Sequence, residues 1–188
     1  MIGRRICVYG PSGSGKTTLA RAIGERLGLP AIEFDAIHHL PNWEERPAEE
    51  FRAIVLETLD GYRDGWVTDG NYRRVRDLVL PLADTVVWLR LPFRVVYWQL
   101  FRRTMTRSWR RQELWSGNRE TFGKAFFSRD SILLWGLTHY NAHFRNIAAT
   151  LEQVPHNAEV IELRSSREVD DFVASLAAER TATAAWTK

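Results

Sequence analysis

The sequence contains little of what a disulfide-stabilised, membrane-spanning or repetitive protein requires. It has one cysteine, Cys7, among 188 residues, so no disulfide can form within the chain, and its apolar neighbours predict buried packing. No apolar run approaches the length of a membrane span, and no internal repeat or low-complexity linker interrupts the chain. The layout of a signal peptide is also missing before the first predicted strand. We therefore expect a cytoplasmic protein with no membrane partner.

Lysine is scarce as well. Lys16, Lys124 and Lys188 are the only three, so arginine supplies nearly all of the positive charge. Guanidinium groups suit phosphate because they bind it through two parallel hydrogen bonds. The formal net charge is +3 and the pI about 9.3, which is too mild a balance to indicate nucleic acid by itself. The positions of the arginines are therefore more informative than their number.

Short apolar strands alternate with helical patterns along the chain, and the length suits one compact domain. The predicted strands are 4–10, 31–34, 65–70, 84–92 and 158–163, and the predicted helices are 17–27, 46–62, 93–105, 130–153 and 165–179. This alternation predicts an α/β fold in which helices cover both faces of a parallel sheet through right-handed crossovers. We expect a single domain over residues 1–180, with residues 181–188 as a loose tail.

The segment "GPSGSGKT" satisfies the phosphate-binding pattern G-x-x-x-x-G-K-[ST], with Gly10, Gly15, Lys16 and Thr17 at its fixed positions. Glycines let the backbone N–H groups turn toward an anion, and the following helix adds its N-terminal dipole. Lys16 would reach the β- and γ-phosphates, and the Thr17 hydroxyl would ligate Mg²⁺. The alternative is a glycine turn that happens to hold a lysine, but a strand leads in and a helix leads out, as the motif requires. The predicted cofactors are therefore ATP and Mg²⁺, and the predicted nucleotide-binding residues of this loop are Gly10, Pro11, Ser12, Gly13, Ser14, Gly15, Lys16, Thr17 and Thr18.

Two aspartates follow neighbouring predicted strands. Asp35 comes after the second strand in "EFDAIHHLPNW", and Asp69 comes after the third in "VTDGNYRRVRD". The carboxyl ends of parallel strands carry the ligand site in such folds, so both carboxylates are expected on the side of the phosphate loop. We predict that Asp69 serves Mg²⁺ and that Asp35 orients or deprotonates an acceptor hydroxyl. The alternative for each is a helix-capping or turn aspartate.

Two adjacent histidines, His38 and His39, follow Asp35 closely. Adjacent side chains cannot both face one site, so at most one contacts the acceptor, and we assign that contact to His39. The alternative is that both are surface or loop histidines. A zinc site is not expected, because no cysteine or histidine partner has ligand spacing nearby.

An arginine-rich segment at about residues 104–130 is the candidate lid of the site. Arginines on a mobile lid would neutralise the transferring phosphoryl group and help to exclude water. The alternative is a solvated basic face. Interleaved aromatic residues such as Trp109 and Trp115 also permit a rival interpretation, stacking of single-stranded nucleic acid, unless they pack the lid onto the long helix. The predicted catalytic arginines of the segment are Arg107, Arg111, Arg119 and Arg129.

Several stretches together resemble a known family. The phosphate loop, "FDAIHHLPNW", "DGNYRRVRDLVLP", "TVVWLRLP", "ELWSGNRE" and "FSRDSILLW" resemble the adenylate-kinase-like P-loop proteins often called topology-modulation proteins, over residues 4–176. More distantly, the layout is similar to adenylate, shikimate and gluconate kinases. The resemblance implies a three-layer α/β/α fold with strand order 2-3-1-4-5. It also implies that Arg103 lies at the adenine and that Asn71 and Arg73 serve the acceptor side, where adenylate kinases carry a D-G-F-P-R segment.

Motif, aspartates and resemblance together predict a P-loop kinase that moves the γ-phosphoryl group of ATP to a small-molecule acceptor. A nucleoside or nucleoside monophosphate is the favoured acceptor, and a sugar acid or polyol is the alternative. A second hypothesis is a nucleic-acid-binding regulator that binds ATP or hydrolyses it slowly, and a third is a nucleotide-dependent binding module without transfer. The kinase requires a small acceptor, the regulator requires salt-sensitive binding of nucleic acid, and the binding module requires neither.

Overall fold

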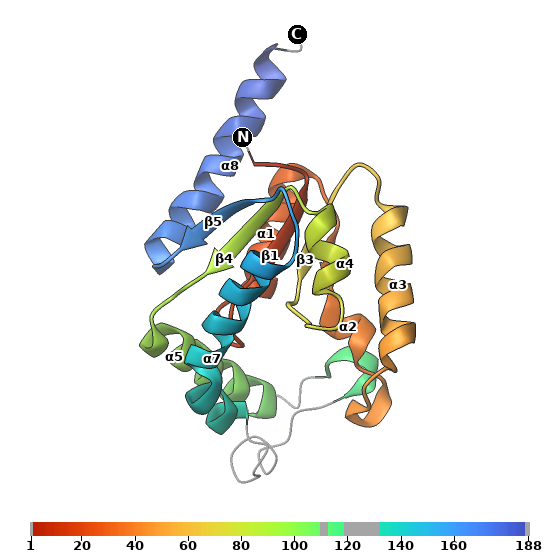
Figure 1. Cartoon of the computed structure of the whole chain (residues 1–188). Coiled ribbons are helices and arrows are strands. Elements are labelled where there is room, and N and C mark those ends of the chain that lie inside the picture. Colours follow the sequence, from red (N-terminus) through yellow and green to blue (C-terminus); the bar gives the residue numbers. More distant parts are fainter. Residues whose placement is uncertain (1, 110–112, 119–131, 187–188) are drawn as a thin grey trace.

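A five-stranded parallel sheet forms the centre of the structure, a computed structural model that describes residues 2–109, 113–118 and 132–186 (Figure 1). Its strands lie in the order β2-β3-β1-β4-β5, and every neighbouring pair is parallel. The predicted strand order is thereby confirmed. The strands are β1 (Arg5–Tyr9), β2 (Ala31–Glu33), β3 (Trp66–Asp69), β4 (Thr85–Leu89) and β5 (Glu159–Leu163).

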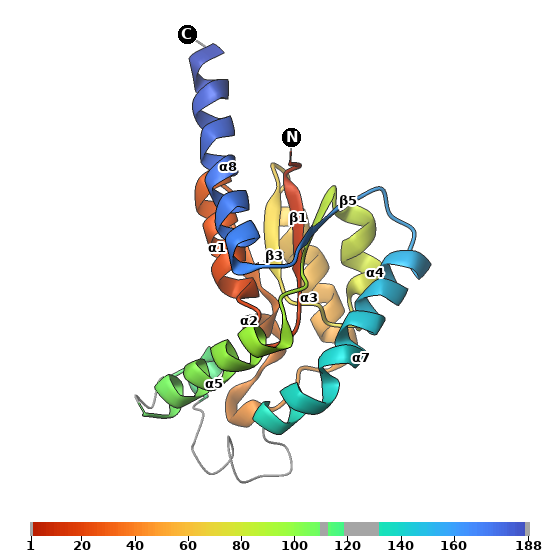
Figure 2. The ribbon, with the colours of Figure 1, turned by 90° about the vertical axis from the view of Figure 1, so that its left-hand side faces the viewer.

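Helices cover both faces of this sheet and complete a three-layer α/β/α architecture. Figure 2 shows α1 and α8 on one face and α3, α4 and α7 on the other. The longer helices are α1 (Lys16–Leu27), α3 (Ala48–Gly61), α5 (Phe93–Trp109), α7 (Ile132–Gln153) and α8 (Ser166–Trp186). The short ones are α2 (Phe34–His38) and α4 (Arg76–Val79), with 3₁₀ turns η1 (Pro41–Trp43), η2 (Leu80–Leu82) and η3 (Trp115–Gly117).

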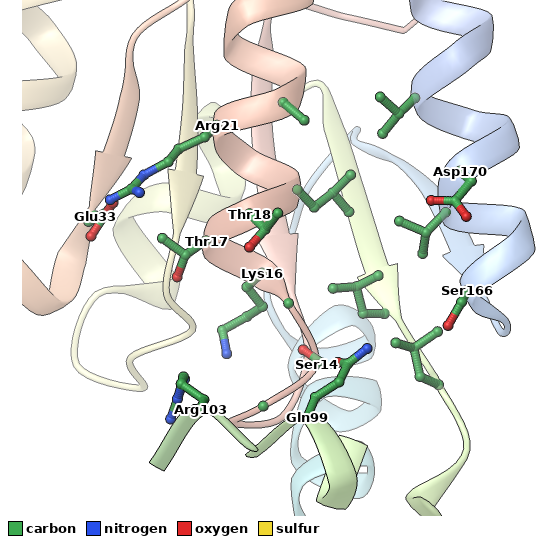
Figure 3. Close-up of a pocket in the computed structure, with 18 of the residues that line it drawn as sticks. Ser14, Lys16, Thr17, Thr18, Arg21, Glu33, Gln99, Arg103, Ser166 and Asp170 are labelled. Carbon is green, nitrogen blue, oxygen red and sulfur yellow. The ribbon is translucent and has the colours of Figure 1, made fainter. Parts of the chain in front are cut away.

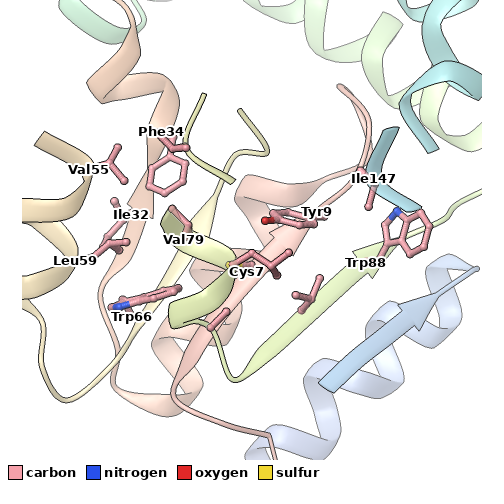
Figure 4. Packing of buried hydrophobic residues seen from close by; sticks show 14 of the residues in the cluster. Cys7, Tyr9, Ile32, Phe34, Val55, Leu59, Trp66, Val79, Trp88 and Ile147 are labelled. Carbon is pink, nitrogen blue, oxygen red and sulfur yellow. The ribbon is translucent and has the colours of Figure 1, made fainter. Parts of the chain in front are cut away.

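Alternate residues of β1 enter two separate hydrophobic clusters, because successive side chains of a strand point to opposite faces. Cys7 and Tyr9 pack with residues of α3, α4 and α7, in the cluster drawn in Figure 4. Ile6 and Val8 pack instead with residues of α1 and α8. Cys7 is fully buried, as its apolar neighbours predict, and burial raises the pKa of its thiol to about 12. Its role is packing.

Two helices are longer than the sequence pattern predicts. α5 continues to Trp109 and takes in the first residues assigned to the lid, and α8 continues to Trp186 where a loose tail from residue 181 was expected. Neither segment contains the glycine or proline that would end a helix, and the alanines within residues 181–186 favour the continuation of α8. Across the described parts of the chain, the helices are all too short or too polar to cross a membrane.

Candidate active site

The phosphate loop and the two aspartates meet at the carboxyl edge of the sheet. β1 runs directly into the loop at Gly10, and its Val8 is in register with Asp69 at the end of β3. Asp69 is in turn in register with Glu33 at the end of β2, immediately before α2. Asp35 is the second residue of that short helix, which the sequence analysis does not predict. The register thus places Asp69 beside the strand that leads into the loop, and Asp35 follows the end of the next strand, β2.

Two glycines shape the loop between β1 and α1. Gly13 has φ +86° and Gly15 has φ +89°, a backbone conformation that L side chains rarely adopt. A Cβ atom at Gly13 would lie 2.7 Å from Leu100 Cβ and 2.8 Å from the Val96 carbonyl oxygen, so the loop packs tightly on α5. Gly15 precedes α1, whose N-terminal N–H groups face the space inside the loop. The loop therefore has the form of an anion cradle backed by a helix N-terminus.

Lys16 is the cation of this cradle. Its Nζ donates a hydrogen bond of 3.1 Å to the Pro11 carbonyl oxygen, so the side chain folds back over the loop. Burial lowers the pKa of Lys16, whereas the nearby charges of Asp69 and Asp35 raise it, and that of Arg103 lowers it. The charges that act on this ammonium group are therefore those of both aspartates and of Arg103. This is the convergence that a phosphoryl-transfer site requires.

Thr17 and Asp69 form the candidate magnesium site. The Thr17 hydroxyl donates a hydrogen bond to Asp69 Oδ2, while Asp69 Oδ1 is buried and has no hydrogen-bond partner among the described residues. Burial raises the pKa of Asp69, and Lys16 and the Thr17 hydrogen bond lower it in part. Mg²⁺ prefers oxygen ligands and keeps several waters, so a hydroxyl, a carboxylate and a nucleotide phosphate fit it. The unpartnered oxygen shows that the residues present fit the metal.

A cleft of about 1000 Å³ opens beside the loop and extends along α1 to α8 (Figure 3). Gly13–Thr18 and Arg103 line its phosphate end, and Arg103 donates a hydrogen bond of 3.2 Å to the Ser12 hydroxyl. Ser166 and Asp170 of α8 line the opposite end, between apolar side chains. The resemblance implies that Arg103 lies at the adenine, whereas its hydrogen bond to Ser12 places it beside the phosphate loop. The cleft is large enough for a nucleotide.

The Asp35 carboxylate accepts a hydrogen bond from another segment of the chain. The Tyr72 hydroxyl, from the segment after β3, donates a hydrogen bond to Asp35 Oδ1. Burial and the charge of Asp35 together raise the pKa of Tyr72 far above its usual range, so this hydroxyl keeps its proton. Tyr72 was not singled out from the sequence as a site residue, although it lies in "DGNYRR". The structure shows that it holds the carboxylate proposed as the base.

The two histidines have different surroundings, and neither is a simple surface residue. His38 is buried, with its ring 5.0 Å from Phe51 and 4.5 Å from Tyr72, and burial lowers its pKa. His39 is half-buried, and its ring stacks on Trp115 with centroids 6.0 Å apart. His38 therefore belongs to the core, and His39 borders the turn that contains Trp115.

That turn, residues 113–118, is hydrogen-bonded to the segment that follows α2. The buried Asn118 donates to the Leu40 carbonyl at 2.8 Å and accepts from the Trp43 backbone N–H at 2.9 Å. The Ser116 hydroxyl donates to the His39 carbonyl at 2.7 Å. Asn118 was not predicted as a site residue from "ELWSGNRE", and its contacts show that it is a buried anchor. The turn thus fixes the loop that follows α2.

The other predicted acceptor and lid residues divide into two groups. Asn71 is half-buried, with its amide nitrogen 2.8 Å from His143 Nε2 of α7, whereas Arg73 is exposed. For Arg107 the structure describes only the backbone, which lies in α5. The remaining predicted lid arginines, Arg111, Arg119 and Arg129, lie outside the described residues. Among these residues, the structure therefore describes the side chains of Asn71 and Arg73, and the lid stays a prediction.

Comparison with known proteins places the loop and the fold in one class. The model of the ATPase family associated with various cellular activities (AAA) matches residues 6–60, from β1 through the phosphate loop to α3. A probable gluconokinase of Schizosaccharomyces pombe is 53% identical over 38 residues, 20% of this chain and 20% of that protein. A bifunctional pantoate ligase/cytidylate kinase of Gloeobacter violaceus is 31% identical over 99 residues, 44% of this chain and 19% of that protein. The chain spans about a fifth of the length of these curated relatives.

Solved structures extend the likeness to nearly the whole chain. A gluconokinase from Sinorhizobium meliloti 1021 matches 96% of this chain and 97% of its own, with a TM-score of 0.52 and 22% identity. A shikimate kinase from Acinetobacter baumannii in complex with shikimate matches 96% of this chain and 94% of its own, with a TM-score of 0.58 and 16% identity. The chain thus carries a phosphate-loop motif within the fold class of these P-loop kinases. Within that class it has the fold of the gluconate and shikimate kinases.

Proposed function

We propose that this protein is an ATP-dependent phosphotransferase that moves the γ-phosphoryl group to a hydroxyl of a small polyhydroxy acid. The observation that carries the proposal is the Asp35 carboxylate, which is anchored by Tyr72 and close enough to Lys16 to raise the pKa of its ammonium group. A carboxylate in that position can accept the proton of an attacking alcohol.

The proposed reaction uses residues from both sides of the sheet edge. The acceptor hydroxyl oxygen bonds to the γ-phosphorus, the bond from that phosphorus to the β–γ bridging oxygen breaks, and ADP leaves. Asp35 takes the hydroxyl proton, and Lys16 with the loop N–H groups neutralises charge on the phosphates. Thr17 and Asp69 would hold Mg²⁺, which shields the phosphate charge when bound. Arg103 lies where it can contact the phosphate chain from α5.

A polyhydroxy acid is favoured over a nucleotide as the acceptor, although the resemblance to adenylate-kinase-like proteins favoured a nucleoside or nucleoside monophosphate. Both solved structures above are kinases named for hydroxy acids, and each matches nearly the whole chain. Support for a nucleotide acceptor is the match to the bifunctional cytidylate kinase, which covers less than half of the chain. The exposed Arg73 offers a cation for the acceptor carboxylate. A nucleoside monophosphate is kept as the second candidate on the strength of that partial match.

The test is ADP release from Mg·ATP with a panel of acceptors. The panel holds gluconate, shikimate, other sugar acids, polyols, nucleosides and nucleoside monophosphates, and Lys16→Met is the control for contaminating kinases. We expect one hydroxy acid to raise ADP release many-fold, with a turnover of about 1–100 s⁻¹ in the wild type and none in the control. A response confined to nucleoside monophosphates would replace the acid by the second candidate. A flat panel with intact ATP binding would overturn the transfer reaction and favour the nucleic-acid regulator.

A further inference from the structure

Two turns from distant parts of the chain have strained backbone conformations. Among the described residues, the non-glycine residues with a positive φ are Asn42 (+63°), Trp43 (+62°) and Ser116 (+56°), and all three lie in η1 or η3. A left-handed conformation is unfavourable for a residue with a side chain, so it persists only where the surrounding structure fixes it. Such conformations are concentrated at functional sites. η1 and η3 are therefore candidates for a functional role.

The two turns belong to segments that are hydrogen-bonded to each other, residues 39–43 and 113–118, which we name the paired turns. The buried Asn118 side chain bonds two backbone groups of the first segment, at 2.8 and 2.9 Å. The Ser116 hydroxyl donates to the His39 carbonyl at 2.7 Å. His39 is the predicted acceptor contact, so a shift of the paired turns would move it.

Glu33 ties the paired turns to the helix that follows the phosphate loop. One of its carboxylate oxygens, Oε2, accepts a hydrogen bond from the Trp115 indole N–H at 3.2 Å. The other, Oε1, accepts from Arg21 Nε of α1 at 2.8 Å, and Arg21 Nη2 donates to the same oxygen. Figure 3 shows the Arg21 side chain reaching from α1 to Glu33 at the end of β2. Each oxygen of this carboxylate therefore has a partner on a different element.

The Glu33 carboxylate lies at the border of the nucleotide cleft. Arg21 and Trp115 line the cleft together with Glu33. Glu33 is in register with Asp69 of β3, and Asp35 follows it by two residues. A continuous series of hydrogen bonds thus runs from α1 through Glu33 to the paired turns, beside both carboxylates of the candidate site.

We propose that Glu33 is a positioning residue that fixes the paired turns relative to α1 by accepting hydrogen bonds from Trp115 and Arg21. The inference rests on the proposed phosphotransfer, because its effect is felt where the acceptor binds. In this role the carboxylate touches neither substrate. Its removal would release Trp115 and let the strained turns relax, so the acceptor would bind less tightly while the phosphate loop keeps its geometry.

Trp115→Phe tests the contact with the smallest change. It removes the indole N–H, keeps a ring that can stack on His39 and leaves the charge of Glu33 in place. We expect it to raise the KM of the hydroxy acid that most stimulates ADP release by about tenfold, the effect of losing a hydrogen bond to a charged group. The kcat and the Kd for adenylyl imidodiphosphate, an ATP analogue, should change by less than about threefold. Trp98→Phe, which removes an exposed indole from α5, is the matched control and should change none of these values.

A second pair of variants tests the carboxylate itself. Glu33→Ala removes both hydrogen bonds, and Glu25→Ala removes an exposed carboxylate from α1 as its control. We expect Glu33→Ala to raise the acceptor KM at least as much as Trp115→Phe does, and Glu25→Ala to leave it unchanged. The double variant of Glu33→Ala with Trp115→Phe should be no worse than Glu33→Ala alone, because both changes break the same contact.

Three results would overturn the inference. The first is a folded Trp115→Phe with an unchanged acceptor KM. The second is an equal rise of that KM in Trp98→Phe, which would show that the loss of any indole has this effect. The third is additive loss in the double variant, which would mean that Glu33 and Trp115 act independently. Circular dichroism checks that each variant is folded, and if either Glu33→Ala or Trp115→Phe does not fold, the other decides the test.

A measurement independent of activity separates this inference from the proposed function. In ¹H–¹⁵N NMR of the whole protein, the indole N–H signal of Trp115 is the one missing from Trp115→Phe. We expect this signal to shift and to exchange faster with solvent in Glu33→Ala, and to be unchanged in Glu25→Ala. If it responds in this way but no acceptor is phosphorylated, the proposed function fails and the tie between Glu33 and Trp115 stands. If transfer is observed while the Trp115 signal is the same in Glu33→Ala, the tie fails and the function stands.

Discussion

The Thr17 hydroxyl donates a hydrogen bond to Asp69, joining the start of α1 to the end of β3 across 52 residues of sequence. The contact holds the two proposed magnesium ligands together before any metal binds. It also leaves Asp69 Oδ1 buried and without a hydrogen-bond partner in the described parts of the chain. A charged oxygen in that position destabilises the fold, and binding of a cation relieves the penalty. The site is thus arranged for its ligand at some expense of stability.

The substitution Asp69→Asn tests whether the buried Asp69 carboxylate destabilises the ligand-free protein. The measurement is the pH dependence of unfolding. Burial raises the pKa of Asp69, so between the unfolded and folded values the native state binds the proton more tightly than the unfolded chain does. Its contribution to stability is therefore present at low pH and lost as pH rises through the folded pKa. Thermal unfolding without ligands should show Asp69→Asn more stable than the wild type at pH 7, by about 2 °C or more, with the gap narrowing toward pH 4. Equal unfolding temperatures at pH 7, or a larger difference at pH 4 than at pH 7, would show that the buried Asp69 carboxylate does not destabilise the fold.

Asp35→Asn and Tyr72→Phe should affect turnover to different extents. Loss of the proposed base is expected to lower kcat by about 100- to 10,000-fold with little change in the Kd for an ATP analogue. Loss of the Tyr72 hydroxyl removes an anchor of the carboxylate but leaves the base, so a fall of about tenfold or less is expected. Steady-state kinetics with the identified acceptor measure both. Full activity in Asp35→Asn would remove Asp35 from the mechanism.

Gly13→Ala should be more damaging to the fold than Gly15→Ala, although both residues have a positive φ. A Cβ at Gly15 meets no atom within 4 Å, so only the backbone strain of about 1 kcal/mol is expected there. At Gly13 the Cβ would also overlap Leu100 and Val96 of α5, which adds about 1–3 kcal/mol. Urea unfolding of the two ligand-free variants gives the comparison. Equal destabilisation would mean that the loop does not pack against α5 as described.

Asn118→Ala should loosen the loop after α2. Asn118 satisfies the Leu40 and Trp115 carbonyls and the Trp43 backbone N–H, and all three would lose a partner. Buried polar groups left unpaired cost about 1–3 kcal/mol each, so a clear fall in unfolding free energy is expected. Asn118→Asp is the matched control, because a carboxylate can still accept from Trp43 but cannot donate to the carbonyls. If Asn118→Asp were as stable as the wild type, the two hydrogen bonds that Asn118 donates would contribute nothing to the free energy of unfolding.

Much of the fold follows from local patterns in the sequence. The five strands and their order were predicted, because short apolar runs that alternate with helical patterns indicate parallel strands and the resemblance supplied the order. Helix ends were less predictable: α5 and α8 run on for lack of a stop signal, and α2 forms where a loop was expected. These differences reflect local propensities that the coarse pattern does not resolve.

Within the site, motif residues were predictable and their partners were not. The spacing of Gly10, Lys16 and Thr17 defines the loop by chemistry alone, and the strand ends point to Asp69. Tyr72 and Trp115 owe their proposed roles to residues 37 and 82 positions away in sequence. Trp115 stands in a segment whose arginines and aromatic residues indicate only a lid or a surface for base stacking. Such pairings depend on tertiary contacts, so no local sequence pattern predicts them.

The most direct test of phosphoryl transfer is ³¹P NMR of the wild-type protein with Mg·ATP and the hydroxy acid that most stimulates ADP release. Transfer predicts a new phosphomonoester resonance that grows in step with ADP, is absent without the acid and is lost in Lys16→Met. Growth of inorganic phosphate alone, at a rate that the acid does not change, would show hydrolysis without transfer and contradict the proposed function.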